Sequence, residues 1–416
     1  MIETFVTNEG SNLINILITL IGYLMPIPLA ILALKLWSHY KKETTALEAK
    51  WTLLEIQIPR EIAKSPSAME LFFSNTFDPK LWFSLEMVSI DGRVHFYIRT
   101  QNNIKDLVQT QIYAQYPQAK VVEIEDYVFD IPKYDKNGDW YVWGCEYSKK
   151  KDDFLPLKTY KAYGEEMRAG TKEEFKVDPI TPIIELLGSL SKGQQLWIQI
   201  LAKHSGKKYY SKKKEKKVEF SEAAPEFLLE LLKPYTKVQK NEKGETDLDI
   251  RTPKTIEPVV KAVSEQLGQL HFECGIRVIA LSDKKIITED QFNGLSRSAK
   301  LIFRQFTLAN SNELERINTT EFEDAWKDPI GTTMNKFKRR LLDSYRLRMF
   351  FHPPMILDLE FPKWLKIFAP TGKPKVFVLS SEELASIFHF PGMVSETPSF
   401  KRVETKIAKP PSNLPI

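Results

Sequence analysis

The sequence predicts an α+β protein with a single transmembrane helix followed by two α/β sandwiches in tandem, and three observations lead to this prediction. A stretch of 22 residues near the N-terminus contains no charged residue. The order strand, helix, strand, strand, helix, strand can be followed over residues 46–135, and it recurs over residues 136–320. This βαββαβ order is that of the ferredoxin-like sandwich, so we expect two such units.

The transmembrane helix is expected over Leu13 to Leu34. At the rise of an α-helix this stretch is about 33 Å long, which is enough to cross a bilayer. Glu3 and Glu9 precede it, whereas lysines follow it from Lys35 onward. The positive-inside rule then places the N-terminus outside and the bulk of the chain in the cytoplasm. The expected location is the inner (cell) membrane, with a single pass.

The elements of the first unit follow from alternation and from turn residues. Apolar and polar residues alternate over residues 53–58, as in a half-buried strand, and Ser65 with Pro66 is typical of a helix start. Asp91-Gly92 between two strand-like runs is a strong hairpin signal. The expected elements are strand 53–58, a helix from residue 66, strands 81–90 and 93–100, a helix over 104–112 and strand 119–126.

The second unit repeats this order around an insertion. Its first strand is expected at LKTYKAY, Leu157 to Tyr163, and Asp178 with the following proline is expected to cap the next helix. Strands are expected at 194–204 and 272–282, and Thr288 with Gln291 has the spacing of a capping box.

The expected organisation of the chain has five parts. They are a tail and transmembrane anchor (1–45), the first α/β unit (46–135), the second unit with a lysine-rich insertion around 204–268 (136–320), a helical and strand–helix region (321–392) and an extended proline-containing tail (393–416).

Motifs for catalysis or metal binding are absent from the sequence. The nearest approach to a phosphate-binding loop, GEEMRAGTK from Gly164, has five residues between its glycines and no lysine directly after the second. The two cysteines and six histidines do not fall at zinc-ligand spacing. We therefore expect a non-catalytic protein without cofactor or metal. The net charge of +5 permits an anionic partner.

One segment combines many cations with aromatic residues. Phosphate neutralisation and base stacking are both chemically available there, so DNA is one candidate partner, anionic lipid is a second, and a solvated loop is the third interpretation. The face of the first unit that carries Arg93, His95, Tyr97 and Arg99 loosely resembles an RNA-recognition sheet. The residues of the segment are Lys207, Lys208, Tyr209, Tyr210, Lys212, Lys213, Lys214, Lys216 and Lys217.

Two stretches resemble a known class of bacterial proteins. They are LLEIQIPREIAKSPSAME (Leu53 to Glu70) and VFVLSSEELASIFHFPG (Val376 to Gly392), followed by the tail that ends in AKPPSNLPI. They resemble the membrane-anchored N-terminal region of type IV secretion and conjugation proteins, which in relatives precedes an ATPase domain of the HerA/FtsK or coupling-protein type. No nucleotide-binding residue is carried over, because the resemblance covers no part of that domain.

The resemblance implies a non-catalytic membrane-anchored subunit that docks a separately encoded ATPase, as part of a DNA- or protein-translocating assembly. A split gene and a truncated product would both explain the missing ATPase, and a homo-oligomer is expected. A nucleic-acid-binding protein tethered to the membrane and a membrane scaffold without a motor are the alternatives. The apolar residues expected to dock the ATPase are Phe400, Val403, Ile407 and Leu414.

Overall fold

The structure, a computed structural model, describes most of the chain between residues 50 and 391. By compactness the chain divides into two units, Met1–Lys50 with Pro353–Ala369 and Trp51–His352 with Pro370–Ile416. The sheet and the helices reported below belong to the second of these units. The described residues are 50–59, 64–76, 82–163, 178–240, 246–250, 252–321, 331–351 and 376–391, with Ala30, Ala33, Leu34 and Trp37.

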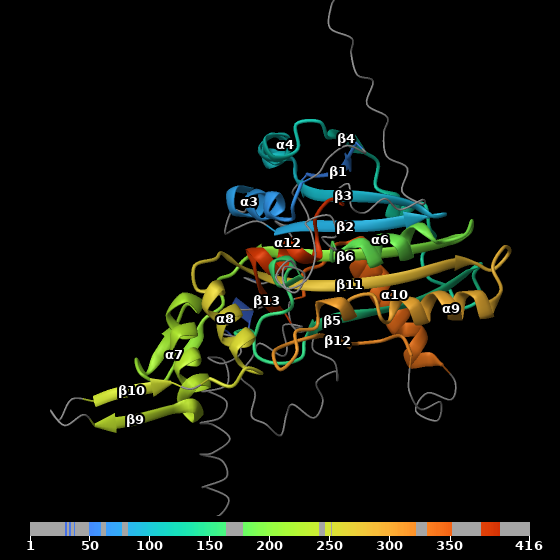
Figure 1. Ribbon diagram of the computed structural model, residues 1–416. Helices are drawn as coiled ribbons and strands as arrows, with labels where there is room; N and C mark the ends of the chain where they lie inside the picture. The colour runs from blue at the N-terminus through green and yellow to red at the C-terminus, as the bar shows by residue number, and fades with distance from the viewer. Residues whose placement is uncertain are drawn as a thin grey trace, which may run out of the picture. The chain divides into compact units, whose positions relative to one another are not determined.

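A nine-stranded sheet forms the centre of the larger unit (Figure 1). Its order is β12–β5–β11–β6–β2–β3–β1–β4, with β13 paired to one end of β11, and the neighbours run antiparallel throughout. The strands are β1 (Trp51–Gln57), β2 (Trp82–Ile90), β3 (Arg93–Gln101), β4 (Lys120–Ile124), β5 (Trp140–Lys149), β6 (Gln194–His204), β11 (His271–Asp283), β12 (Leu314–Ile317) and β13 (Phe377–Ser380).

The sheet consists of two halves that repeat one arrangement. The first half is β1, α3 (Ser67–Thr76), β2, β3, α4 (Lys105–Gln115) and β4. The second half is β5, α6 (Thr181–Gly188), β6, β11, α9 (Glu289–Ala299) and β12. Numbered within its own half, each set of strands has the order 4-1-3-2.

The two halves join where β2 pairs with β6, each the second strand of its half. Both strands are buried on both faces over nearly their whole length. An apolar edge strand of this kind would pair with another chain if it were left open. Pairing β2 with β6 removes both edges, so the units expected as sandwiches in tandem share one continuous sheet.

The prediction of a transmembrane helix is wrong on the evidence of the described helices, since none of them is long and apolar enough to cross a bilayer. A span needs about 20 apolar residues in one helix, and the longest described helix, α10 (Thr332–Arg346), has 15 residues and is strongly basic. The single-pass inner-membrane location and the orientation built on that helix are corrected with it. Most of Leu13 to Leu34 lies outside the described residues.

The prediction of a strand at Leu157 to Tyr163 is also wrong. Tyr160 to Tyr163 are helical, and the first strand of the second half is β5. The backbone N–H groups of Leu157 and Tyr160 donate to the side chains of Glu383 and Ser386 at 2.8 and 2.9 Å. Side chains 226 residues away thus accept the backbone hydrogen bonds that a neighbouring strand would otherwise accept. The alternation of apolar and polar residues in a short segment cannot reveal such distant partners.

The hairpin turn at Asp91-Gly92 and the capping box at Thr288 are confirmed, whereas the expected cap at Asp178 is wrong, because the N-cap residue of α6 is Ile180. Asp91 and Gly92 have φ of 54° and 79°, as a two-residue hairpin turn requires. Thr288 with Gln291 forms a complete capping box at the start of α9. Ser380 with Glu383 does the same for α12 (Ser381–Ile387).

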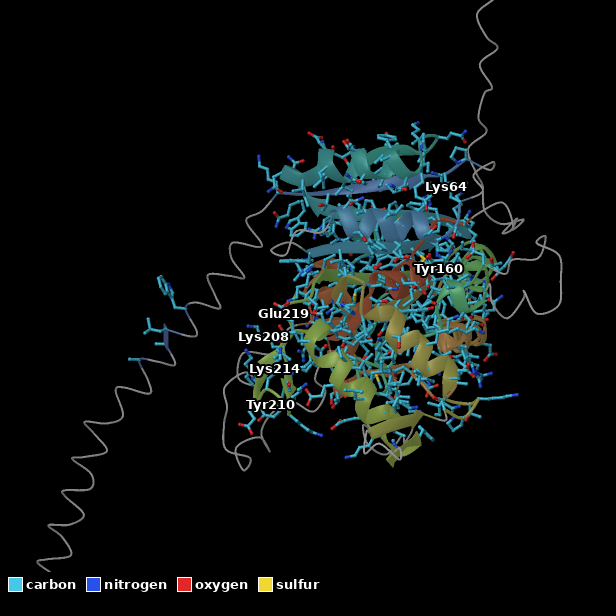
Figure 2. All side chains as sticks on the ribbon, turned by 60° about the vertical axis from the view of Figure 1, so that its left-hand side comes forward. Lys64, Tyr160, Lys208, Tyr210, Lys214 and Glu219 are labelled. Atoms are coloured by element: carbon cyan, nitrogen blue, oxygen red, sulfur yellow. The ribbon has the colours of Figure 1, made fainter. Side chains whose placement is uncertain are left out.

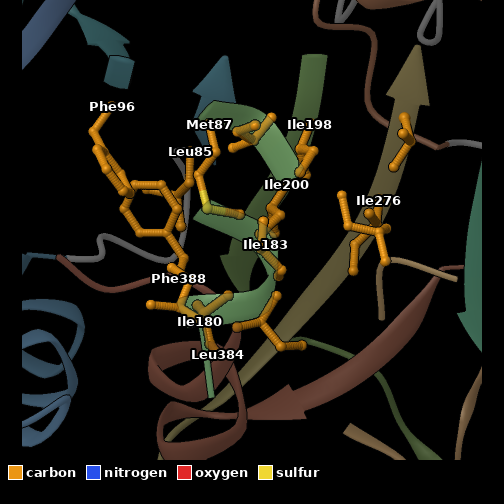
Figure 3. Close-up of a cluster of buried hydrophobic side chains, with 14 of the residues drawn as sticks. Leu85, Met87, Phe96, Ile180, Ile183, Ile198, Ile200, Ile276, Leu384 and Phe388 are labelled. Atoms are coloured by element: carbon orange, nitrogen blue, oxygen red, sulfur yellow. The ribbon is translucent and has the colours of Figure 1, made fainter. Parts of the chain in front are cut away.

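Helices α3, α4, α6, α9 and α12 pack on one face of the sheet, here called the helical face. Figure 3 shows Leu384 and Phe388 from α12 and its C-terminal end beside Leu85 and Met87 of β2. The opposite face, here called the second face, is covered by α10 and by the connector between the halves, which contains the short 3₁₀ helix η2 (Tyr127–Phe129).

The insertion between β6 and β11 forms a separate group of elements. Its fold positions the lysine-rich segment predicted from the sequence. The elements are β7 (Tyr209–Ser211), β8 (Lys216–Val218), α7 (Phe220–Leu232), β9 (Thr236–Lys240), β10 (Thr246–Ile250) and α8 (Glu257–Gln266).

Gly275 in β11 marks a close approach on the second face. A Cβ atom at this position would lie 1.9 Å from Cδ2 of Phe351, far inside contact distance. Phe351 is buried and lies under the guanidinium of Arg277, whose Cζ is 3.8 Å from the ring centroid. The missing side chain therefore allows the segment after α10 to lie directly on the sheet.

We expect Gly275→Ala to lower the free energy of unfolding by about 1–3 kcal/mol, as overpacking of a core does. Gly294→Ala is the control, because a Cβ atom there meets nothing within 4 Å and alanine favours the helix. Urea denaturation of both variants measures the difference. Equal stability of Gly275→Ala and the unaltered protein would contradict the close approach.

Candidate functional site: a buried charge cluster and a basic hairpin

A row of polar residues crosses the middle of the second face, where apolar residues would be expected. The members are directly opposite one another on neighbouring strands, so their side chains lie on the same face. Most of them are buried among the apolar residues that α10 and the connector cover. In order across the sheet they are Glu55, Tyr97, Glu86, Gln199, Arg277 and Glu146.

Arg348 enters this row from the end of α10 and binds two carboxylates. Its Nε and Nη2 lie 2.9 and 3.1 Å from the oxygens of Glu86. Its Nη1 and Nη2 also lie 2.6 and 2.9 Å from the oxygens of Asp126 in the connector. Arg348 and Glu86 both have fully buried side chains. Such fork-to-fork pairs are the strongest ion pairs that arginine makes.

The backbone at Arg348 explains how the side chain reaches this position. The N–H of Met349 donates to Ser344 O and that of Arg348 donates to Tyr345 O, which together close the helix end in a Schellman motif. Arg348 occupies the left-handed position of that motif with φ of 47°. Glycine is usual there, so an arginine at this site accepts backbone strain of about 1–2 kcal/mol to place its guanidinium.

The environment of Glu86 fixes its charge. Burial is the largest effect and would raise its pKa, but the charge and hydrogen bonds of Arg348 and the hydrogen bonds from Ser84 and Tyr127 outweigh it. The pKa of Glu86 is therefore lowered. The hydroxyl of Tyr127 donates to Glu86 at 2.7 Å and lies 2.8 Å from that of Tyr345. Glu86 is thus ionised and hydrogen-bonded on all sides by the protein.

A second arginine continues the cluster into the other half of the sheet. Arg277 Nε donates to Glu146 at 3.0 Å, and its Nη1 donates to Met349 O at 2.6 Å. Gln199, between Glu86 and Arg277 in the row, donates to Tyr345 O at 3.1 Å. Gln199 and Arg277 therefore bind the segment 344–349, and Arg348 of that segment binds Glu86, so this cluster fastens the end of α10 to both halves. Its polar groups are directed at one another, which favours a structural role.

The predicted basic segment forms the β7–β8 hairpin with the residues just before it, and we call residues 207–218 the basic hairpin. Several of its cations are paired. Lys212 lies 2.7 Å from Glu230, and Lys214 lies 2.7 Å from Glu222. Lys207 contacts Asp153, whose Oδ2 also accepts from the hydroxyl of Tyr209 at 3.1 Å. The sequence alone does not separate these paired lysines from the others.

The remaining predicted residues of the hairpin point into solvent. Tyr210 has 65 % of its surface exposed. Within the described part of the chain, Lys208, Lys213, Lys216 and Lys217 are exposed and no ion pair of their ammonium groups is found. The nine predicted residues therefore fall into a set whose polar groups are paired within the protein and a set that is exposed to solvent.

An acidic stripe on α7, missed by the sequence reasoning, holds the hairpin in place. Glu222, Glu226 and Glu230 are spaced by four residues and so share one face of the helix. Glu226 accepts from the hydroxyl of Ser211 at 2.7 Å and from the N–H of Lys213 at 3.0 Å. The spacing was visible in the sequence and could have signalled that part of the lysine run is neutralised.

The face of the first half that resembles an RNA-recognition sheet is occupied by the protein itself. Tyr97 is 3 % exposed and stacks on Tyr127 with ring centroids 5.0 Å apart. His95 Nδ1 lies 2.6 Å from Glu55, and the Arg99 guanidinium lies 4.6 Å from the Trp51 ring centroid. An aromatic platform for bases is therefore not available at Tyr97.

The predicted docking residues of the tail, Phe400, Val403, Ile407 and Leu414, lie outside the described residues. The stretch that leads to them is wholly buried from Phe377 to Pro391. Even its charged residues are inside, and Glu383 lies 2.7 Å from Lys149 with both side chains 1 % exposed. Helix α12 is thus part of the core rather than an appendage.

The turn between α8 and β11 carries polar atoms that find no partner. Among the described residues, Gln266, Gln269 and His271 all have buried side-chain atoms without a hydrogen bond. The His271 ring stacks on Phe220 at 3.8 Å between centroids. Burial, followed by the charges of Lys149 and His204, lowers the pKa of His271 to about 4. In the same described part of the chain no group of three or more His, Cys, Asp or Glu could hold a metal ion.

The structure defines an α+β protein built on one antiparallel sheet and closed by a buried charge cluster. A domain family described as a domain of unknown function (DUF8128) matches residues 74–402, and the chain belongs to this family. The match extends from the end of α3 past α12, and so includes the basic hairpin and the charge cluster apart from Glu55. No curated protein matches the chain.

We expect Arg348→Gly to lower the free energy of unfolding by about 3–5 kcal/mol, because it leaves Glu86 buried without its counter-charge. Glycine removes the backbone strain, so the loss cannot be ascribed to φ. The double variant Arg348→Gly with Glu86→Gln should recover part of the loss, since position 86 then carries no charge that lacks its partner. Chemical denaturation of the four proteins tests this, and additive effects would contradict the direct pair.

We expect His271 to make the protein less stable as the pH falls from 7 to 4. The pKa of His271 is lowered from its usual 6.5 to about 4, so its contribution is complete above pH 6.5 and is lost as the pH falls toward 4. His271→Phe keeps the stacking on Phe220 and removes the titration. Over this range the unaltered protein should lose about 3 kcal/mol more than the variant in denaturation experiments. Parallel pH profiles would contradict the prediction.

Proposed function

We propose that this chain is a non-catalytic subunit of a translocation assembly that docks an ATPase of the HerA/FtsK or coupling-protein type. The observation that carries the proposal is the complete burial of residues 377–391 directly ahead of the proline-containing tail. The chain enters this tail from a buried helix, so a partner bound to the tail would be linked to the core through that helix.

The contacts of β13 and α12 support a strong attachment. β13 pairs with β11 over His271 to Cys274, beyond the point where β5 ends its own pairing with β11. The buried pair between Lys149 and Glu383 joins α12 to the last residue of β5. Breaking a buried pair costs about 3–5 kcal/mol, so pulling on the tail would meet substantial resistance.

The titratable groups of the charge cluster bind other groups of the protein, which supports a docking role rather than a catalytic one. Glu86, Arg277 and Arg348, which belong to the buried charge cluster, bind protein groups at hydrogen-bond distance. The class of the partner rests on the resemblance of Leu53 to Glu70 and Val376 to Gly392 to proteins that carry such an ATPase. Docking would use the apolar residues of the tail, each worth about 1.5–3 kcal/mol when buried.

We expect Phe400→Ala combined with Leu414→Ala to reduce recovery of the ATPase with the tagged protein by at least tenfold. Loss of two buried apolar side chains removes more than the 1.4 kcal/mol that a factor of ten requires. The control changes Lys401, Lys406 and Lys409 to Ser, because charges at the rim of an interface mainly alter the association rate. The measurement is co-purification from cells, with the recovered ATPase identified by its sequence.

Both variants should keep the denaturation midpoint of the unaltered protein, since the changes lie beyond α12. Undiminished recovery of the ATPase with the Phe400 and Leu414 variant would overturn the proposal. Recovery of no HerA/FtsK-type ATPase with the unaltered protein would do so too.

A further inference from the structure

The outer face of the basic hairpin presents an aromatic ring directly beside a cation. Tyr210 of β7 is opposite Lys217 of β8 in the antiparallel register, so both side chains project from the same face. Tyr209 and Val218, the next pair along, face the other way and are part of an apolar cluster with Phe154. Figure 2 labels Tyr210, Lys208 and Lys214 on this part of the molecule.

The hairpin is short, but aromatic side chains and helix α7 pack against it. The Tyr209 ring lies 4.7 Å from that of Phe154 and 5.7 Å from that of Phe220, between centroids. The acidic stripe of α7 holds the turn through Lys212, Lys214 and Ser211. The outer residues are therefore displayed on a fixed base, and binding would order few side chains.

The charge of the outer face suits a narrow polyanion. Setting aside Lys207, Lys212 and Lys214, which are paired, and Lys216, which is opposite Ser211 and so projects from the other face, the exposed lysines that remain are Lys208, Lys213 and Lys217. A single strand suits this face, because a base can stack on the exposed ring of Tyr210 while the phosphates contact the lysines.

We propose that the outer face of the basic hairpin binds single-stranded nucleic acid, with a base stacked on Tyr210 and phosphates contacted by Lys208, Lys213 and Lys217. Stacking on an exposed aromatic ring accepts any base, and lysines beside it follow the backbone. Binding of this kind is independent of sequence and strongly dependent on salt. This site is separate from the docking function and does not rest on it.

Fluorescence anisotropy of a labelled oligothymidylate with the full chain tests the proposal. With three phosphate contacts, the logarithm of the binding constant should fall with the logarithm of salt with a slope of about −2. Lys213→Ser with Lys217→Ser should reduce the magnitude of that slope by about 1.4, because two contacts are lost. Lys212→Ser with Lys214→Ser is the matched control, since it removes the same charge from paired positions and should leave the slope nearly unchanged.

Tyr210 provides the second half of the test. Tyr210→Ala should weaken binding about tenfold with the salt slope unchanged, whereas Tyr210→Phe should bind as the unaltered protein does. Circular dichroism should show all these variants folded, since the altered residues are exposed.

Three results would overturn the proposal. The first is no binding of the oligonucleotide at low salt. The second is an equal loss in the two pairs of lysine variants, which would show that only net charge matters. The third is tighter binding to phosphatidylserine vesicles than to the oligonucleotide, with the vesicle binding lost in Lys213→Ser with Lys217→Ser, which would assign the face to lipid.

Discussion

The side chain of Arg348 joins three parts of the chain that lie far apart in the sequence. It binds Glu86 in the first half of the sheet and Asp126 in the connector, and it projects from the end of α10. Its backbone adopts the left-handed conformation that glycine normally takes. Two bidentate pairs shielded from water outweigh that strain, so the sequence tolerates an unfavourable backbone to obtain a favourable charge contact.

The shared sheet and its cover depend on this contact. Pairing of β2 with β6 merges the halves. The row of polar residues at this junction is shielded from water, so its members need hydrogen-bond partners within the protein. The segment 344–351 satisfies it through Gln199, Arg277 and Glu86, and Gly275 leaves room for Phe351. On the helical face α12 completes the core in the same way, through the buried pair of Glu383 with Lys149. A rigid body of this kind is what both proposed interactions need.

The sequence predicted the turns, helix caps and strands that depend on neighbouring residues alone. Asp91-Gly92, the two capping boxes and the strand QQLWIQILAKH are where turn chemistry and alternation placed them. It did not predict contacts between distant residues. The strand expected at Leu157 to Tyr163 is wrong because α12 satisfies that backbone, and the transmembrane helix is not supported by the described helices. The sequence named the lysines and tyrosines of the basic hairpin as a possible anionic-partner contact, but which lysines are paired depends on α7 folding against them. The charge cluster was missed because isolated polar residues in apolar strands become a row only through strand register.

Hydrogen exchange measured by mass spectrometry tests most directly whether the two halves form one cooperative structure. If β2–β6 pairing and the Arg348 cluster join them, amides of β1 to β3 and amides of β5, β6 and β11 should open with the same free energy, equal to that of global unfolding. Raising the urea concentration should lower both together. Exchange of one half at a concentration where the other stays protected would contradict the account.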